Sequence, residues 1–347
     1  MRLPAEWERQ SGIQLTWPDA DTPWYRLDLV QECYVKVAFH ILRHEPLLMV
    51  CRDDASCRAD LGRIAASLAL DIPFDNILFR ESPLNDTWAR DHGPIAVHGD
   101  GEEKLLLDFV FNGWGLKFAS DLDNQITRRI YGAAAFCRDV RLVDMRPFVL
   151  EGGSIDTDGE GTMIATESCL CSLNRNEYLD RDGIQARLKD CFGLRRILWL
   201  RNGEIAGDDT DSHVDILARF CSPDTIAYTA CDDPQDVNYL SLKAMEEQLR
   251  TFRTLGGKPY RLCPLPLPEP MYLDGYRLPA SYANFLIING AVLMPGVGSG
   301  KDAIAAEALQ SIFPDREVVT IDCRPLLSGH GGLHCITMNY PEGWLEL

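Results

Sequence analysis

The sequence predicts an α/β fold in which short strands and helices alternate along the whole chain. Three observations support this prediction: stretches with helical spacing of apolar residues, short β-rich runs between them, and turn residues that join neighbouring runs. At 347 residues the chain is long enough to bury a full hydrophobic core. We expect one domain over residues 1–347, because no low-complexity or glycine- and serine-rich linker divides it.

Residue spacing predicts the individual elements. Apolar residues recur at three- and four-residue intervals in five stretches, which predicts helices at residues 28–43, 58–69, 122–136, 235–253 and 301–312. Residues that favour strands form short runs, which predicts strands at residues 47–50, 105–111, 162–165, 197–200, 225–228, 285–288, 292–293 and 318–321. The proline-rich residues 263–270 are predicted to form a surface loop.

Turn residues join several of these strands as hairpins. The pairs Asp100-Gly101, Asp158-Gly159 and Asn289-Gly290 each lie between two β runs. The tripeptide at residues 222–224 joins a fourth pair of runs. A hairpin therefore recurs roughly every 60 residues, which predicts a repeat architecture.

The starts of these repeats carry polar or reactive residues. The hairpins begin near Asp91, Glu151, His213 and Ser281, and a further β run follows Cys335. Repeats arranged around an axis would bring equivalent strand ends together. The pattern therefore predicts one central site to which all five starts contribute.

The charge of the chain restricts its partners. The sequence has 34 Lys+Arg against 52 Asp+Glu, for a net charge of -18. This excess of acid argues against nucleic acid or an anionic membrane surface as a partner and favours a small cation. Acidity alone would also serve solubility, so the charge supports a cationic ligand without identifying one.

We expect a soluble, cytoplasmic protein. The N-terminus has no apolar signal region, and no stretch approaches the roughly 18 apolar residues of a membrane span. The twelve cysteines lack the spacing of a zinc site. Free thiols in a reducing cytosol fit this pattern best.

Cys335 is the candidate nucleophile. It follows a loop with glycines at residues 329, 331 and 332, which would let the backbone approach a ligand closely, and it is adjacent to His334. A buried cysteine taken alone is usually inert, so the glycine loop and the other candidate residues carry this interpretation.

His213 and Asp215 form a second candidate pair. They open an apolar alternating run, and residues two apart in a strand point to the same face. A histidine can protonate a leaving amine and then deprotonate water, while a neighbouring carboxylate holds a cation. The motif alone equally fits a structural histidine at the edge of a loop.

Two further segments concentrate polar groups. Residues 85–94 contain Asp91 together with an aromatic residue, a basic residue and a Gly-Pro turn, although a capped turn with a surface ion pair would look similar. Glu151 follows an apolar run and precedes two glycines, which also fits an ordinary β-turn. As a functional residue, Glu151 would orient the imidazole of His213.

Three competing site types are disfavoured. Residues 295–302 resemble a phosphate loop, but Pro295 replaces the first glycine and Asp302 replaces the Ser or Thr. The acids around residues 208–215 lack the glycine and terminal glutamate of a calcium loop, and no H-E-x-x-H motif occurs. No G-x-S-x-G elbow supports a serine nucleophile. We therefore expect neither a metal nor an organic cofactor.

With these residues in view, the chain resembles the agmatine deiminase branch of the bacterial peptidyl-arginine deiminase family, within the guanidine-modifying, or pentein, superfamily. The resemblance runs nearly end to end. Its motifs lie at residues 4–8, 16–18, 85–94, 111–115, 150–154, 174–176, 207–215, 278–282 and 334–337. The sequence differs from the family's usual residues at His92, Asp209, Ser212 and residues 330–333. These positions flank the expected catalytic residues, so the differences bear on the identity of the substrate.

The resemblance implies a five-bladed α/β propeller of ββαβ modules with pseudo-fivefold symmetry. It also implies a hydrolase acting on the C–N bonds of linear amidines, which converts agmatine to N-carbamoylputrescine and ammonia through a covalent cysteine thiouronium intermediate. Such a reaction belongs to polyamine and putrescine biosynthesis. The alternatives are arginine or peptidyl-arginine as substrate, or a binding-only pentein.

The resemblance also implies residue roles. Cys335 would be the nucleophile, His213 the acid and base, Asp91 and Asp215 the guanidinium clamp, and Glu151 the residue that orients His213. Trp88, Trp114 and Asn284 would line the substrate channel. The expected partner is a small cationic guanidinium substrate, with neither nucleic acid nor membrane, and a homo-oligomer is compatible with the sequence.

Overall fold

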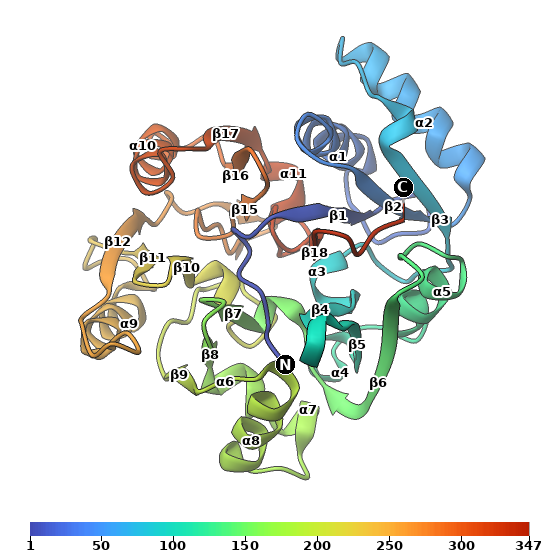
Figure 1. Ribbon diagram of the computed structural model, residues 1–347. Coiled ribbons are helices and arrows are strands. Elements are labelled where there is room, and N and C mark those ends of the chain that lie inside the picture. Colours follow the sequence, from blue (N-terminus) through green and yellow to red (C-terminus); the bar gives the residue numbers. More distant parts are fainter. Residues whose placement is uncertain (347) are drawn as a thin grey trace.

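The computed structural model describes residues 1–346, and within them five modules of the same design form a ring (Figure 1). Each module contains an antiparallel strand pair, a helix, and a third strand parallel to the second. The helix lies in the crossover because a parallel pair requires the chain to return to the same end of the sheet. The predicted propeller of ββαβ modules is therefore confirmed.

The first module contains both ends of the chain. Strand β1 (Gln10–Thr16) pairs antiparallel with β18 (Thr337–Pro341) and parallel with β2 (Leu47–Cys51). Helix α1 (Leu27–Leu42) connects β1 to β2, and α2 (Asp54–Ser67) leads to a fourth strand, β3 (Ile77–Glu81). Pairing of the first strand with the last closes the ring (Figure 1).

The other four modules follow in chain order. Their strands and crossover helices are β4 (Ile95–His98), β5 (Lys104–Val110), α5 (Ile126–Gly132) and β6 (Val140–Val149); β7 (Ile155–Thr157), β8 (Thr162–Thr166), α8 (Arg181–Phe192) and β9 (Arg196–Leu200); β10 (Ala218–Ser222), β11 (Thr225–Ala230), α9 (Tyr239–Thr251) and β12 (Arg261–Pro266); and β15 (Leu286–Ile287), β16 (Ala291–Gly296), α10 (Asp302–Ile312) and β17 (Glu317–Asp322).

Shorter elements lie in the connections. They are α3 (Ala89–His92), α4 (Gly113–Leu116), α6 (Glu167–Leu170), α7 (Leu173–Asn176), α11 (Arg324–Leu327), the hairpin of β13 (Tyr272–Leu273) and β14 (Tyr276–Arg277), and the 3-10 turns η1 (Phe74–Asn76), η2 (Asp100–Glu102), η3 (Asp123–Gln125), η4 (Gly152–Ser154) and η5 (Val214–Ile216). The predicted hairpin turns all join the first two strands of a module.

Helix α8 was not predicted from residue spacing, although its ends are well defined. The side chain of Asp180 accepts the backbone N–H of Gly183 at the start, and Gly193 ends the helix in the left-handed region with φ +65°. Charged and polar residues fill half of the twelve positions. The apolar stripe is therefore short, and packing against the third sheet stabilises a helix that periodicity alone does not reveal.

The prediction of a surface loop at residues 263–270 is wrong in its first half. Strand β12 includes residues up to Pro266 and pairs parallel with β11, at the edge of the fourth sheet. Pro264 and Pro266 are two residues apart, so their nitrogens face the same side of the strand. An edge strand tolerates this arrangement because one side of its backbone has no partner strand.

The strand expected at His213 is also different in the structure. His213 and Asp215 lie at the start of the turn η5, and β10 begins only at Ala218. Similar single turns, α3 and η4, precede β4 and β7. The module starts therefore meet the axis as short turns, and two residues of one turn can both reach the centre without the alternation of a strand.

Each helix packs its apolar side on the sheet of its own module. In the fourth module, Leu242, Met245 and Leu249 of α9 are buried with Ile226 and Tyr228 of β11.

All twelve cysteines are free thiols in the described chain. None of the helices in residues 1–346 combines the length and apolar character that a bilayer crossing requires.

Two leucines of α9 test this packing. Leu242 is 1 % exposed and Leu240 is 80 % exposed. Leu242→Ala should lower the free energy of unfolding by about 2–5 kcal/mol, because it leaves a cavity in the core. Leu240→Ala should change it by less than about 0.5 kcal/mol, since a surface leucine makes few contacts. Urea denaturation followed by circular dichroism compares the two, and equal losses would contradict this assignment of the core.

Candidate active site

A cavity of about 220 Å³ lies where the module starts converge. Asp91, His213, Asp215 and Cys335 are buried residues of its lining. Trp88 and Trp114 form aromatic walls, and Asp86, Asp208, Asp209 and His330 lie among the less enclosed lining residues. Six of the eight predicted site residues therefore line one cavity. Glu151 and Asn284 are buried beside it.

Cys335 lies in the turn before β18. The Nδ2 group of Asn284 donates to its Sγ at 3.2 Å, and Oδ2 of Asp215 lies 3.7 Å from the same sulfur. Burial raises the pKa of the Cys335 thiol well above its ordinary value, and the charges of Asp215 and Asp91 raise it further. Without a bound cation, the thiol is therefore protonated at neutral pH.

The glycines before Cys335 have a packing role. A Cβ at residue 331 would lie 2.2 Å from the ring of Trp88, and one at residue 332 would lie 2.4 Å from Oδ1 of Asn284. The predicted close approach of backbone is present, but its partners are the two side chains that shape the cavity. These glycines thus hold Trp88 and Asn284 against the nucleophile loop.

Asp91 receives only neutral hydrogen-bond donors. Nε1 of Trp114 donates to Oδ2 at 2.9 Å, and the backbone N–H of Gly153 donates to Oδ1 at 3.0 Å. Burial raises the pKa of Asp91, and the favourable charge of His213 does not fully offset the burial and the repulsion from Asp215. Asp91 is therefore the clamp carboxylate that is harder to ionise in the free protein.

An unusual backbone segment aims the indole of Trp114. Residues Gly113, Trp114 and Gly115 all have positive φ, at +68°, +56° and +82°. The side chain of Asn112 accepts the N–H of Gly115 at 2.9 Å and fixes this turn. A left-handed tryptophan costs conformational energy, and surrounding contacts must hold it.

Asp215 is buried but retains an open acceptor. Its Oδ2 lies 2.8 Å from Nδ1 of His334, whereas its Oδ1 has no hydrogen-bond partner among residues 1–346. Burial alone would raise the pKa of Asp215, but the hydrogen bond and charge of His334 lower it below the ordinary value. An ionised carboxylate with a free oxygen is suited to accept a cationic N–H group.

His213 faces Asp91. Its Nδ1 lies 3.6 Å from Oδ1 of Asp91, and its Nε2 has no partner within the described chain. Burial alone would lower the pKa of His213. The charge of Asp91, the contact with Cys169 and the charge of Glu151 outweigh burial, so the pKa is raised well above its usual value. The imidazole is therefore a proton donor at neutral pH.

Gly153 lies between these groups. A Cβ at this position would be 2.6 Å from Nδ1 of His213, 2.9 Å from Oδ1 of Asp91 and 3.1 Å from Oδ2 of Asp215. Any larger residue would push His213, Asp91 and Asp215 apart. The second glycine after Glu151, first interpreted as part of a turn, is thus a steric requirement of the site.

Glu151 binds an arginine behind the cavity. Both of its carboxylate oxygens lie 3.0 Å from Nε of Arg175, and no hydrogen bond to His213 is formed. Nη1 of the same arginine donates to Asp211 at 2.6 Å and Nη2 to the carbonyl of Thr210 at 2.9 Å. Arg175 therefore ties Glu151 to the loop that carries His213. Any influence of Glu151 on the imidazole is electrostatic or passes through this loop.

Glu151, Cys169 and His213 are a group of described residues that could hold a metal, with ligand atoms within 4.8 Å of one another. Arg175 already places a cation on the Glu151 carboxylate. The charge of this cluster is thus balanced within the protein, and an added dication would face a neighbouring guanidinium.

Residue patterns did not reveal three contributors to the site. Arg175, His334 and Glu6 were seen only inside motifs or beside Cys335, with no assigned role. Glu6 lies 2.8 Å from Nε2 of His334, although the two residues are 328 positions apart. A charged residue within an otherwise apolar or turn segment is the one sequence signal that such buried partners leave.

Comparison with known proteins places the chain among guanidine-modifying enzymes. A profile of the Porphyromonas-type peptidyl-arginine deiminase family matches residues 2–341. The agmatine deiminase of Pseudomonas aeruginosa is 35% identical, over 98% of this chain and 95% of that protein.

Solved structures agree. A Porphyromonas gingivalis protein named provisionally as an arginine deiminase has 49% identity and a TM-score of 0.92, covering 99% of both chains. A C. jejuni agmatine deiminase with substrate bound has 35% identity and a TM-score of 0.89, covering 99% of this chain and 96% of that one.

The reactivity of Cys335 tests the electrostatics of the cavity. Asp215→Asn should accelerate alkylation of Cys335 by iodoacetamide at pH 8 by about tenfold, because removal of a neighbouring negative charge lowers the pKa of the thiol and the thiolate is the reactive form. Mass spectrometry of the peptide that contains Cys335 gives the rate. The surface substitution Asp139→Asn should leave the alkylation rate of Cys335 unchanged. An alkylation rate in Asp215→Asn equal to that of the wild type would contradict the repulsion between Asp215 and the Cys335 thiolate.

Proposed function

Because the chain belongs to the Porphyromonas-type peptidyl-arginine deiminase family, we propose that it hydrolyses the guanidinium group of agmatine to N-carbamoylputrescine and ammonia. The observation that carries this proposal is the meeting of Cys335, His213 and two carboxylates in one cavity, with an oxygen of Asp215 left free. These are the groups that hydrolysis of a C–N bond in a linear amidine requires.

The substrate group explains the need for a clamp. A guanidinium is a planar cation whose charge is delocalised, so its carbon is a poor electrophile in water. Asp91 and Asp215 would hold its N–H groups and fix the carbon beside Cys335. Both carboxylates line the same cavity, so one small planar group could contact both.

The bound cation would also activate the nucleophile. Burial, together with the charges of Asp215 and Asp91, raises the pKa of the Cys335 thiol and keeps it protonated in the free protein. A guanidinium between them offsets their charge, the thiol loses its proton to solvent, and the thiolate forms only when substrate is present.

The first half of the reaction forms a C–S bond and breaks a C–N bond. The thiolate of Cys335 adds to the guanidinium carbon, and the raised pKa of His213 leaves it protonated and able to donate to the departing nitrogen. Ammonia leaves, and a cationic thiouronium remains attached to the sulfur. His213 is then neutral.

The second half reverses the proton transfer. Neutral His213 removes one proton from water, and the oxygen adds to the thiouronium carbon. The C–S bond then breaks as the remaining hydroxyl proton passes to the sulfur, which forms the C=O bond of the product and restores the Cys335 thiol. The product is a neutral ureido compound. It no longer carries the charge that the two carboxylates bind, which favours its release.

The entrance of the cavity favours a substrate with a second positive charge. Asp86 and Asp209 both line it, and burial raises the pKa of each to about 6. No lysine or arginine is found among the described residues that line the cavity. Nearby Lys117 donates to Asp211 at 2.7 Å and to the carbonyl of Asp209. The carboxylate of arginine would therefore lack a free partner, whereas the ammonium of agmatine faces two acids.

Arginine is the second candidate substrate. The 49% identical structure of the Porphyromonas gingivalis protein bears the name of an arginine deiminase, which favours arginine or arginyl peptides. The acidic entrance argues for agmatine, since an unpaired carboxylate desolvated beside Asp86 and Asp209 is penalised.

We further propose one catalytic domain in the cytosol. The site combines residues from different modules, with Asp91 before β4 and Cys335 before β18, so no single module could form it. Free thiols, including the proposed nucleophile, are maintained most readily in a reducing compartment.

Replacement of the nucleophile tests the mechanism. Cys335→Ala should reduce ammonia release from agmatine by at least about a thousandfold, because no covalent intermediate can form. Binding of agmatine, measured by calorimetry, should persist because Asp91 and Asp215 remain. Cys221→Ala, at a buried thiol outside the cavity, is the matched control. Activity of Cys335→Ala within tenfold of the wild type would refute the assigned role.

The choice of substrate is tested by pH and by a matched ligand. Butylguanidine has the guanidinium and the four-carbon chain of agmatine but no ammonium. Asp86 and Asp209 lose their charge as the pH falls through about 6, so the kcat/KM ratio of agmatine over butylguanidine should fall across this range.

At pH 7.5, the kcat/KM for agmatine should exceed that for arginine by at least about a hundredfold. The Asp209→Asn substitution should lower the ratio of kcat/KM for agmatine over butylguanidine. Equal rates on agmatine and arginine, or a preference for arginyl peptides, would instead identify the second candidate.

A further inference from the structure

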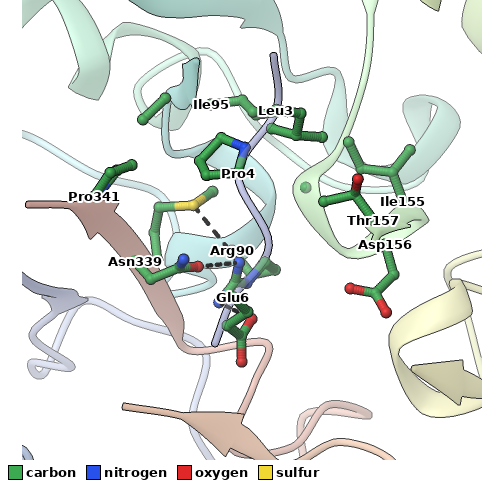
Figure 2. A pocket seen from close by; sticks show the side chains of 13 residues that line it. Leu3, Pro4, Glu6, Arg90, Ile95, Ile155, Asp156, Thr157, Asn339 and Pro341 are labelled. Carbon is green, nitrogen blue, oxygen red and sulfur yellow. Dashed lines mark hydrogen bonds and ion pairs between the residues drawn. The ribbon is translucent and has the colours of Figure 1, made fainter. Parts of the chain in front are cut away.

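A second cavity, of about 70 Å³, is lined by Glu6 and Arg90 among other residues (Figure 2). Arg90 and Asp91 are neighbours in α3, yet Arg90 lines this smaller cavity with Glu6, whereas Asp91 lines the larger one. Glu6 belongs to the N-terminal segment, which crosses the middle of the ring before it enters β1 (Figure 1). The N-terminal segment therefore carries a carboxylate to the back of the active site.

One backbone N–H group and two guanidinium groups surround the carboxylate of Glu6. Its Oε1 accepts the backbone N–H of Ile287 at 2.8 Å. Its Oε2 lies 3.0 Å from Nη2 of Arg219 and 3.6 Å from Nη2 of Arg90. Figure 2 shows Glu6 against Arg90, whose Nη1 donates to Asn339 at 2.9 Å. Burial alone would raise the pKa of Glu6, but Arg219 and the other cations lower it far below its ordinary value. Glu6 is therefore a fixed anion.

His334 connects this anion to the substrate clamp. Its Nε2 lies 2.8 Å from Oε2 of Glu6, and its Nδ1 lies 2.8 Å from Oδ2 of Asp215. Both ring nitrogens of His334 thus lie within hydrogen-bond distance of a carboxylate oxygen. Ionised carboxylates can only accept hydrogen bonds, so this geometry is fully satisfied when each ring nitrogen carries a proton.

We propose that His334, held by Glu6, is a positioning residue that keeps Asp215 charged and turns its free Oδ1 toward the guanidinium substrate. This inference rests on the proposed deiminase function for its role, although the bridge itself is a property of the free protein. His334 is 2% exposed and does not line the substrate cavity. It therefore acts through Asp215 and has no contact with the reacting atoms.

Several other charged groups lie around Asp215 and His334. The charged or titratable groups that face Asp215 from the elements packed around it are His334 and Cys335 before β18, His213 at η5, Asp91 and Arg90 of α3, and Arg219 of β10. Those that face His334 are Asp215, Glu6 and Asp156.

Arg219 and Arg90 are engaged by Glu6, and His213 lies against Asp91. Within residues 1–346, His334 is the one cation in hydrogen-bond contact with Asp215.

The bridge explains why the two clamp carboxylates differ. Asp91 has neutral donors and a raised pKa, whereas Asp215 has the imidazolium and a lowered pKa. Two carboxylates that converge on one point repel each other, and without a counter-charge one of them would hold a proton. The charge of His334 therefore keeps Asp215, and not Asp91, as the carboxylate that stays ionised.

The His334→Gln variant tests the role. Gln keeps a neutral donor but removes the charge, so the pKa of Asp215 should rise and the acidic limb of the kcat/KM profile for agmatine should move to higher pH. Loss of a charge-assisted hydrogen bond predicts a fall of about 10- to 100-fold in kcat/KM at pH 7, mainly through KM.

A matched control is His92→Gln, since His92 is also buried but forms no ion pair with the clamp. An acidic limb that stays unchanged in His334→Gln, or one that shifts equally in His92→Gln, would overturn the proposal.

A measurement on the wild-type protein does not depend on activity or on the folding of a variant. Nitrogen-15 spectra of histidine-labelled protein should show both ring nitrogens of His334 protonated from pH 6 to pH 9, and Glu6→Gln should reduce the proton occupancy at this pH range. A neutral His334 ring in the wild type at pH 7 would refute the bridge.

The two proposals fail in different ways. If the wild type releases no ammonia from agmatine, arginine or arginyl peptides, the proposed function fails even when the imidazolium is observed. If the wild type is active but His334 is neutral, the function stands and the bridge does not.

Discussion

The balance of buried charge near the axis is the constraint on which the site depends. Acidic and basic side chains that are far apart in the sequence meet there with little access to water. The acids are Glu6, Asp91, Glu151, Asp156 and Asp215, and the cations are Arg90, Arg175, Arg219, His213 and His334. A buried charge without a partner is costly, so each carboxylate needs its cation. The ring provides this by placing residues from different modules within hydrogen-bond distance.

The repeat explains how so many groups reach one place. Every module begins at the axis with a turn, and the turns carry Asp91, Glu151 and His213 before their strands diverge. The last module start, with His334 and Cys335, is fixed because β18 pairs with β1 and closes the ring. Glu6 precedes β1, so this closure also brings the two ends of the chain to His334. The strand pairing that closes the ring therefore also brings these site residues together.

The repeat and the reactive residues could be predicted from the sequence, but the pairs that the buried charged residues form could not. Hairpin turns and spacing predicted a repeat, and the resemblance implied its ββαβ modules. Of the five predicted starts, those at Asp91, His213 and Cys335 line one cavity, whereas Glu151 and Ser281 do not line it. The strand expected at His213 was wrong because a 3-10 turn can bring residues two apart to one site. The loop expected at residues 263–270 was wrong in part because an edge strand accepts proline. Pairs such as Glu6 with His334 leave no local pattern, since their contact exists only after the ring closes.

A site balanced in this way has a consequence for reactivity. In the free protein, burial and the charges of Asp215 and Asp91 raise the pKa of the Cys335 thiol and keep it protonated, while the raised pKa of His213 leaves it with the proton that the proposed mechanism would give to the leaving group. A neutral ligand would leave this state unchanged. A cation that fits between Asp91 and Asp215 removes the repulsion and makes the thiolate favourable, so the same charge that binds the substrate also prepares its attack. In the proposed mechanism, the imidazolium of His334 maintains the charge of Asp215. The thiolate of Cys335 therefore forms only while a guanidinium is bound.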